Sequence, residues 1–337
     1  MFYSNVRGVY FWYFERRRDL SHKESRKRKI NSKNKNILIQ GETSLDLYDS
    51  VEFKQIASTG ETEVLSTEVW PFSNGNSLIE LDSGLIVVYH FNGDLEYFSI
   101  KDKTITHECT IKKAFPNNYH RSQSVILIPL ANNNFVFCQD NYIKVYNADA
   151  PYSQEPKIST TLNQEKYPYF ESMIKLSNKN VIVGGKNNKL YFFDLDTLKI
   201  NKEVDVSAGD TINHAICLIQ INDDLLVSGM RYVNLKTYEV TPYMDSNGDY
   251  RFYGGIKLRD GNLLISGESV ADVLGEEWHH SFNYLVNPRL SWQSCHDNAY
   301  GHGYNYYVLD NNTLLYISGE EIAVYKYWIL LYFSKNH

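Results

Sequence analysis

The chain has 337 residues, of which 43% are hydrophobic, and a net charge of −6 at neutral pH. It contains no apolar run of about 20 residues, the length a membrane-spanning helix needs, and it shows no signal peptide with a small-residue cleavage site. With 27 Tyr and 16 Phe against 4 Met, the composition favours strands over helical bundles.

The chain opens with an aromatic run, Val9 to Phe14, which is followed by a basic segment. This segment, Arg16 to Lys35, holds ten Lys/Arg and two acids, a net charge of +8, so the remainder sums to about −14. An acidic body repels nucleic-acid phosphates, so nucleic-acid binding is expected only from the basic segment. Within it, Arg26 to Lys29 is typical of a nuclear-localisation cluster. The same residues run directly into Ile30, which favours a solvated edge of the first repeat.

From Lys29 onward, within the end of the basic segment, one pattern recurs seven times: an apolar residue, a polar turn, a β-rich run, a second polar turn and an alternating strand. The clearest copy runs from Met173 to Asp194, and a near-duplicate runs from Lys29 to Asp49. Periods of about 40 to 45 residues are typical of four-stranded propeller blades. The apolar residues before the first turn, here called the anchors and spaced 37 to 51 residues apart, are Ile30, Leu81, Leu130, Leu176, Ile221, Leu258 and Leu309.

Several copies carry more specific motifs. In the third, Asp140 precedes a strand that ends in Tyr146 and Asn147; the last copy opens with Gly301-His302; the fourth continues into the polar turn from Asp194 to Leu198. These features resemble the turn Asp and closing strand, the Gly-His lead-in and the turn between the third and fourth strands of the WD40-like β-propeller family. No copy has the family's Trp-Asp pair. The resemblance implies an all-β fold with a single seven-bladed propeller of four-stranded antiparallel blades, with six or eight blades as alternatives.

The expected domain organisation is an N-terminal aromatic and basic segment at 1–23, a propeller at 24–333 and a tail at 334–337. WD40-like rings commonly close by pairing an N-terminal strand with the last blade, and Val6 to Glu15 is placed to do so. A competing hypothesis has Trp328 to Phe333 as the last blade's own fourth strand. Closure matters because an open ring exposes strand edges that invite aggregation.

The sequence offers little for catalysis. It has no phosphate-binding glycine loop, no G-x-S-x-G elbow and no H-E-x-x-H. The four cysteines lack the paired spacing of a zinc site, which indicates reduced thiols in an intracellular protein. The one cluster of zinc-ligand types combines Glu276 to His280 with Cys295 to Asp297 and His302, but adjacent histidines on a strand point to opposite faces. We therefore expect no catalytic residue, no cofactor and no metal.

The sequence instead predicts a binding surface. In a propeller, the connections from each outer strand to the next inner strand lie on one face, the top face. These connections are expected to carry large aromatic and Arg side chains, the types that dominate protein–protein hot spots. The candidates are Trp70, Phe72, Tyr119, His120, Arg121, Tyr167, Tyr169, Phe170, Tyr250, Arg251, Tyr253, Trp292 and Tyr300. The competing interpretation is that they simply pack between blades.

We therefore expect a non-enzymatic scaffold or adaptor that binds a peptide or partner protein on the top face. It is expected to be cytoplasmic, or nuclear through Arg26 to Lys29, and a monomeric ring within a larger complex. One alternative is a propeller hydrolase or lyase with its site at the central channel. Such an enzyme needs several polar residues at inner-strand positions, but these positions are mostly apolar here, with Glu80 and Lys175 as the exceptions. A second is a nucleic-acid-associated protein that binds through its basic segment.

Overall fold

In the computed structural model the described residues are 10–19, 28–31, 36–40, 45–49, 54–59, 78–89, 93–114, 125–139, 142–149, 152–162, 170–176, 180–185, 187–207, 217–242, 249–258, 261–273, 276–287, 292–297, 305–308, 313–317 and 322–331. Side chains are described at Leu38 and for those residues from 45 to 267, apart from Val125, Glu171, 249–253 and Ser266. Throughout the described residues the secondary structure is β, with no helix that could span a membrane.

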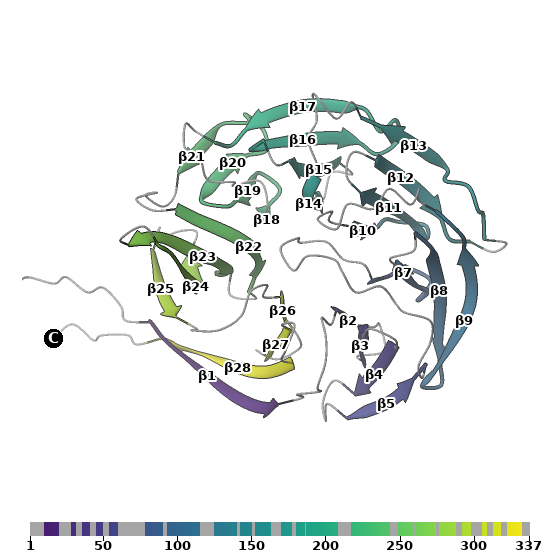
Figure 1. Ribbon diagram of the computed structural model, residues 1–337, viewed down its shortest axis with the longest axis horizontal. Coiled ribbons are helices and arrows are strands. Elements are labelled where there is room, and N and C mark those ends of the chain that lie inside the picture. The colour runs from purple at the N-terminus through teal and green to yellow at the C-terminus, as the bar shows by residue number, and fades with distance from the viewer. Residues whose placement is uncertain are drawn as a thin grey trace, which may run out of the picture.

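The described strands form seven four-stranded antiparallel sheets, and six of them follow chain order from first to fourth strand. The sheets fan around a common centre in a β-propeller-like arrangement (Figure 1). The first strands of successive sheets contact one another from β2 to β26. The strands of these six sheets are β2 (Arg28–Asn31), β3 (Asn36–Gln40), β4 (Leu45–Asp49) and β5 (Gln55–Ser58); β6 (Leu78–Glu80), β7 (Ile86–Tyr89), β8 (Leu95–Lys101) and β9 (Thr104–Ile111); β10 (Val125–Pro129), β11 (Asn134–Gln139), β12 (Tyr142–Asn147) and β13 (Ile158–Thr161); β14 (Phe170–Lys175), β15 (Asn180–Gly185), β16 (Lys189–Asp194) and β17 (Ile200–Asp205); β18 (Leu218–Asn222), β19 (Leu225–Ser228), β20 (Arg231–Asn234) and β21 (Val240–Pro242); β22 (Asp249–Lys257), β23 (Leu263–Val273), β24 (Glu276–Asn287) and β25 (Trp292–Asp297).

The remaining sheet joins the two ends of the chain. Its order is β1-β28-β27-β26, with β26 (Asn305–Val308), β27 (Thr313–Ile317), β28 (Ile322–Leu331) and β1 (Tyr10–Asp19). β1 runs antiparallel to β28, from Tyr10 opposite Leu331 to Asp19 opposite Ala323. Trp328 to Leu331 therefore belong to the third strand of this sheet, and the N-terminal strand is the outermost one. Arg16, Arg17 and Arg18 lie within β1, so part of the basic segment is strand.

The anchors end the first strands as the repeat predicts. Leu81, Leu130, Leu176 and Leu258 each donate their backbone N–H to the carbonyl four residues later, at 2.7–2.8 Å. The third residue after the anchor has a positive φ in three copies, 85° at Gly84, 54° at Asn133 and 88° at Gly261. Glycine and asparagine tolerate this conformation best, which explains why they recur there. The predicted strand–turn–strand repeat is confirmed in these sheets.

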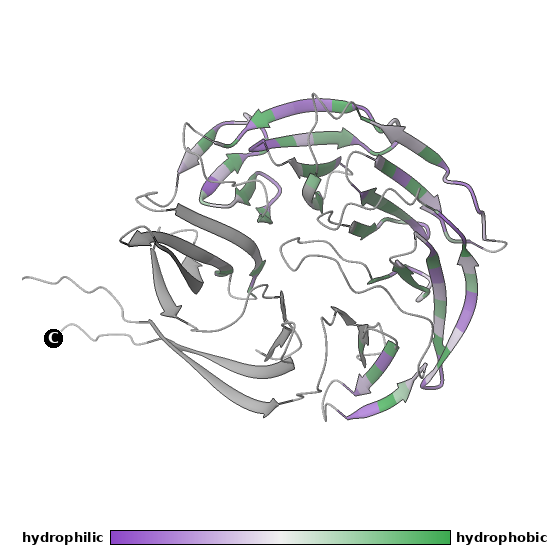
Figure 2. Ribbon diagram, viewed as in Figure 1, coloured by the Kyte–Doolittle hydropathy of each residue, from purple (hydrophilic) through white to green (hydrophobic). Residues whose placement is uncertain are grey.

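The hydrophobic cores lie between successive sheets. Val181 and Val183 of β15 pack toward the preceding sheet, and Ile182 between them packs toward the following one. Because both faces of this second strand are covered, its apolar run is continuous rather than alternating. The outer strands are more exposed, and polar stretches are visible in β13 and β17 (Figure 2). Deleting a large aromatic ring from such a core, such as Phe137 at 0% exposure, typically costs about 3–5 kcal/mol.

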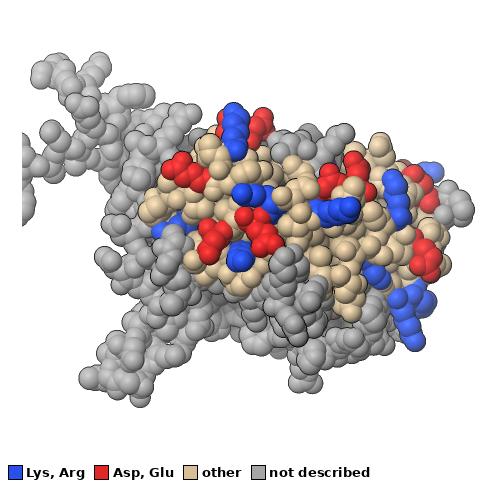
Figure 3. Space-filling model, turned by 90° about the horizontal axis from the view of Figure 1, so that it is seen from above, with Lys and Arg blue, Asp and Glu red and all other residues tan. Residues whose placement is uncertain are grey.

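The turns divide between two faces of the disc. Because the strands of each sheet are antiparallel, the starts of the first strands, the ends of the second, the starts of the third and the ends of the fourth lie at one face, the top face. The opposite strand ends lie at the other face, the bottom face. On the edge seen in Figure 3, described acidic and basic side chains alternate without a large patch of one sign.

Candidate functional site

The connection from β9 to β10, which carries three of the predicted contact residues, begins at a fixed point. Asp94, in the turn before β8, is only 4% exposed. Its Oδ1 accepts the backbone N–H of Lys113 at 2.7 Å, and its Oδ2 lies 2.8 Å from Lys112 Nζ. Lys113 has a φ of 50°, which is uncommon for a residue with a side chain. Asp94 thus holds the first two residues of the connection to its own sheet.

The next residue of the connection is held by the neighbouring sheet. The carbonyl of Ala114, which is 5% exposed, accepts a hydrogen bond from Lys144 Nζ at 2.6 Å and one from the Tyr146 hydroxyl at 3.3 Å. Burial lowers the pKa of Lys144, against the opposing effect of Glu155. Burial also raises the pKa of Tyr146 to about 12, so its hydroxyl stays a proton donor at neutral pH. We call Asp94, Lys112, Lys113 and Ala114, with these two partners, the root of the connection.

Tyr119, His120 and Arg121 follow this root after a few residues, and they lie outside the described residues. So do Trp70 and Phe72 in the β5–β6 connection, Tyr167 and Tyr169 in the β13–β14 connection and Tyr300 in the β25–β26 connection. By chain order, these eight residues belong to outer-to-inner connections, as the sequence predicts.

Five candidates lie in strands rather than in connections, and four of them belong to the sheet β22–β25. Tyr250, Arg251 and Tyr253 belong to β22, and Trp292 is the first residue of β25, opposite Asn287. The start of β25 is the bottom-face end of that strand. Trp292 therefore lies at the bottom-face end of a strand, and not in a top-face connection as the sequence predicted.

Phe170 begins β14 and is buried at 1% exposure. Its ring makes edge-to-face contacts with Tyr191 at 5.7 Å and Phe193 at 6.2 Å between ring centroids. It packs in the core shared by β10–β13 and β14–β17. Its side chain is therefore not available to a partner in this structure.

Asp94, Lys144 and Ala114 are parts of the site that the sequence motifs did not predict. A signal did exist for Asp94, because it lies in the turn between second and third strands, where the third copy has the family-like Asp140. Lys144 and Ala114 carry no such signal, because their contact joins residues 30 positions apart in neighbouring sheets.

The structure brings no metal site together in its described part. There, no group of three or more His, Cys, Asp or Glu side chains is close enough to hold an ion. Of the cluster weighed from the sequence, His296 in β25 pairs with Asn283, whereas His279 and His280 in β24 lie beyond the last residue paired with β25. His302 lies outside the described residues.

The sequence was compared with models of known protein families and with curated proteins, and neither comparison finds a match. The WD40-like resemblance therefore depends on the motifs and on the arrangement of the sheets.

Proposed function

We propose that this protein is a non-enzymatic interaction scaffold, a closed seven-bladed WD40-like propeller whose top-face connections bind a peptide or partner protein. The observation that carries the proposal is the root of the β9–β10 connection. A loop whose first three residues are fixed by two sheets loses less conformational entropy when it binds, so more of its contact energy appears as affinity.

The composition of this connection fits the role. Tyr119, His120 and Arg121 follow the root, and Tyr and Arg are enriched among the residues that dominate interface energy. Two further top-face connections contribute Trp70 with Phe72 and Tyr167 with Tyr169. Loops on a rigid framework are the usual carriers of binding function.

We further infer a cytoplasmic location. Among the described residues, Cys109, Cys138 and Cys217 take part in no disulfide. Reduced cysteines are usual in a reducing compartment.

The test is a pull-down from native lysate with quantitative mass spectrometry, comparing wild type with the triple variant Tyr119→Ala/His120→Ala/Arg121→Ala. The matched control is Gln154→Ala/Lys157→Ala/Lys199→Ala, which removes three exposed side chains from the bottom face. We expect a partner that is lost from the first variant and retained by the second. A partner retained by both folded variants, or lost from both, would remove the connection from the binding site.

A further inference from the structure

The position that immediately precedes the first hairpin turn lies at the bottom-face end of every first strand. In the described sheets, the residue at this position pairs with a residue near the start of the second strand, the second one after the turn. Lys175 pairs with Val181, and Lys257 pairs with Leu263. Because the first strands contact one another around the centre of the disc, these equivalent positions come together on the bottom face around that centre, which we call the bottom mouth of the channel.

Glu80, Pro129, Lys175 and Lys257 are each more exposed than the anchor that follows, whereas Gln220 and Ile221 are both half-buried. Lys175 and Lys257 are exposed, while the adjacent anchors Leu176 and Leu258 are each 2% exposed. Both flanks of a first strand are covered by neighbouring sheets, so exposure at this position indicates a side chain that extends past the bottom-face edge of the packed cores. The seven residues at this position, taken around the ring, are Asn31, Glu80, Pro129, Lys175, Gln220, Lys257 and Val308.

Three successive sheets therefore supply Lys175, Gln220 and Lys257, two cations and an amide, with Glu80 as the one acid in the set. The half-buried Gln220 amide donates to the carbonyl of Asn222 at 3.1 Å, so the two lysines carry the site. Lys257 Nζ reaches across to the preceding sheet and donates to the carbonyl of Ile221 at 2.5 Å. This contact holds its ammonium at the channel mouth while leaving two N–H donors, because a lysine has three. The arc is positive in a chain whose body outside the basic segment is acidic.

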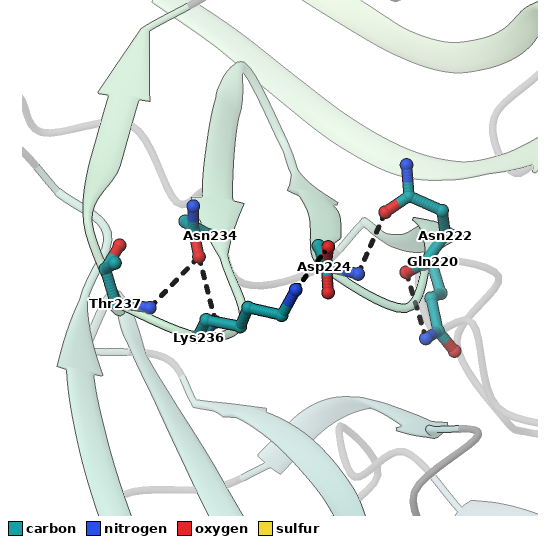
Figure 4. Close-up of polar contacts among 6 residues, drawn as sticks. All are labelled: Gln220, Asn222, Asp224, Asn234, Lys236 and Thr237. Carbon is teal, nitrogen blue, oxygen red and sulfur yellow. Dashed lines mark hydrogen bonds and ion pairs between the residues drawn. The ribbon is translucent and has the colours of Figure 1, made fainter.

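The β18–β19 turn, which follows Gln220 in the chain, carries acidic residues, of which Asp224 forms an ion pair with Lys236. Asp224 Oδ2 lies 2.7 Å from Lys236 Nζ, and its carbonyl accepts the backbone N–H of Leu235. In Figure 4, Lys236 approaches Asp224 from the side away from Gln220. Asn222 and Asn234 fix the two turns by accepting backbone N–H groups at 2.8–3.0 Å. The bottom-face turns beside the arc are thus tied together.

We propose that Lys175, Gln220 and Lys257 form a binding site for a multivalent oxyanion at the bottom mouth of the channel. Two ammonium groups separated by one sheet match a ligand that carries at least two anionic groups, and charge-assisted hydrogen bonds to such groups are the strong ones. Phosphate and carboxylate share this chemistry, so the source is either a polyphosphorylated small molecule or an acidic peptide. The site lies on the face opposite the proposed partner surface and does not depend on it.

The test is isothermal titration of the full chain with two probes, inorganic tripolyphosphate and a pentaglutamate peptide, at low and moderate salt. The variant Lys175→Glu/Lys257→Glu reverses both charges. The matched control, Lys101→Glu/Lys199→Glu, makes the same change in net charge at exposed lysines of outer bottom-face turns. Circular dichroism and thermal melting establish that each variant is folded, and Lys175→Gln/Lys257→Gln replaces the first variant if charge reversal prevents folding.

We expect wild type to bind at least one probe, the channel variant to bind it roughly 10-fold more weakly or worse, and the control to change it less than about 2-fold. Binding of tripolyphosphate alone identifies phosphate as the source, and binding of the peptide alone identifies carboxylate. Glu80→Gln is expected to tighten binding because it removes the acid of the set. The proposal is overturned if wild type binds neither probe, or if the control weakens binding as much as the channel variant.

Discussion

Asp94→Ala tests whether the root of the β9–β10 connection is held by its carboxylate. The substitution removes the acceptor for Lys113 N–H, a hydrogen bond to a charged group worth about 1.5–3 kcal/mol. It also removes the ion pair with Lys112, whose side chain is 69% exposed, so this second contribution is about 0–1 kcal/mol. The expected loss in the free energy of unfolding is therefore about 1.5–4 kcal/mol.

Urea denaturation followed by circular dichroism measures this loss, with Lys112→Ala as the matched control. We expect the control to cost less than about 1 kcal/mol, because it removes only the screened ion pair. Hydrogen exchange at residues 112–114 should accelerate in Asp94→Ala. Equal costs for the two variants would refute the assignment of the main contribution to the Lys113 hydrogen bond, and a cost below 1 kcal/mol for Asp94→Ala would refute the root itself.

Three further predictions concern packing, thiol reactivity and acid stability. Gly255→Ala should cost about 1–3 kcal/mol in urea denaturation, because the added Cβ would lie 2.7 Å from a side chain of the neighbouring sheet. Gly84→Ala should cost about 1 kcal/mol, because Gly84 has a φ of 85° but open space around it. A larger cost for Gly84→Ala than for Gly255→Ala would contradict the packing at Gly255. In the native protein, iodoacetamide should label half-buried Cys109 much faster than Cys217, whose pKa burial raises to about 12, and mass spectrometry would disprove this if both react alike. Hydrogen bonds from Thr197 hold the pKa of Asp194 below its usual 3.8, so this carboxylate stabilises the fold above that pH and the contribution is lost as pH falls through the lowered value. Asp194→Asn should therefore make acid unfolding below pH 4 less steep, and an unchanged acid transition would rule this out.

The strands were predictable because the repeated pattern of apolar and polar residues determines where each strand and turn lies. An anchor such as Leu176, followed by a polar turn and an apolar run, specifies a hairpin wherever it recurs. The turn between third and fourth strands is also specified locally. Asp194 and Asn234 each accept two backbone N–H groups of that turn through a side-chain oxygen. These are local signals, readable within a few residues.

The candidate site was less predictable because its contacts are not local. The Lys144–Ala114 hydrogen bond depends on how two sheets pack, which no spacing in the sequence encodes. Phe170 was predicted to be a contact residue because it is an aromatic residue next to a connection. In the structure its side chain is buried between sheets. An aromatic side chain at a strand end satisfies either role, and only the packing of its ring distinguishes them.

The central claim is that partners bind the top-face connections, and site-specific photo-crosslinking tests it most directly. A photoreactive phenylalanine analogue would be placed at Tyr119, beyond the root, and in a second protein at Gln154, an exposed residue of the bottom face. We predict that irradiation in native lysate attaches a partner at position 119 and none at position 154. A partner that co-purifies with both proteins yet crosslinks only at position 154 would contradict the account.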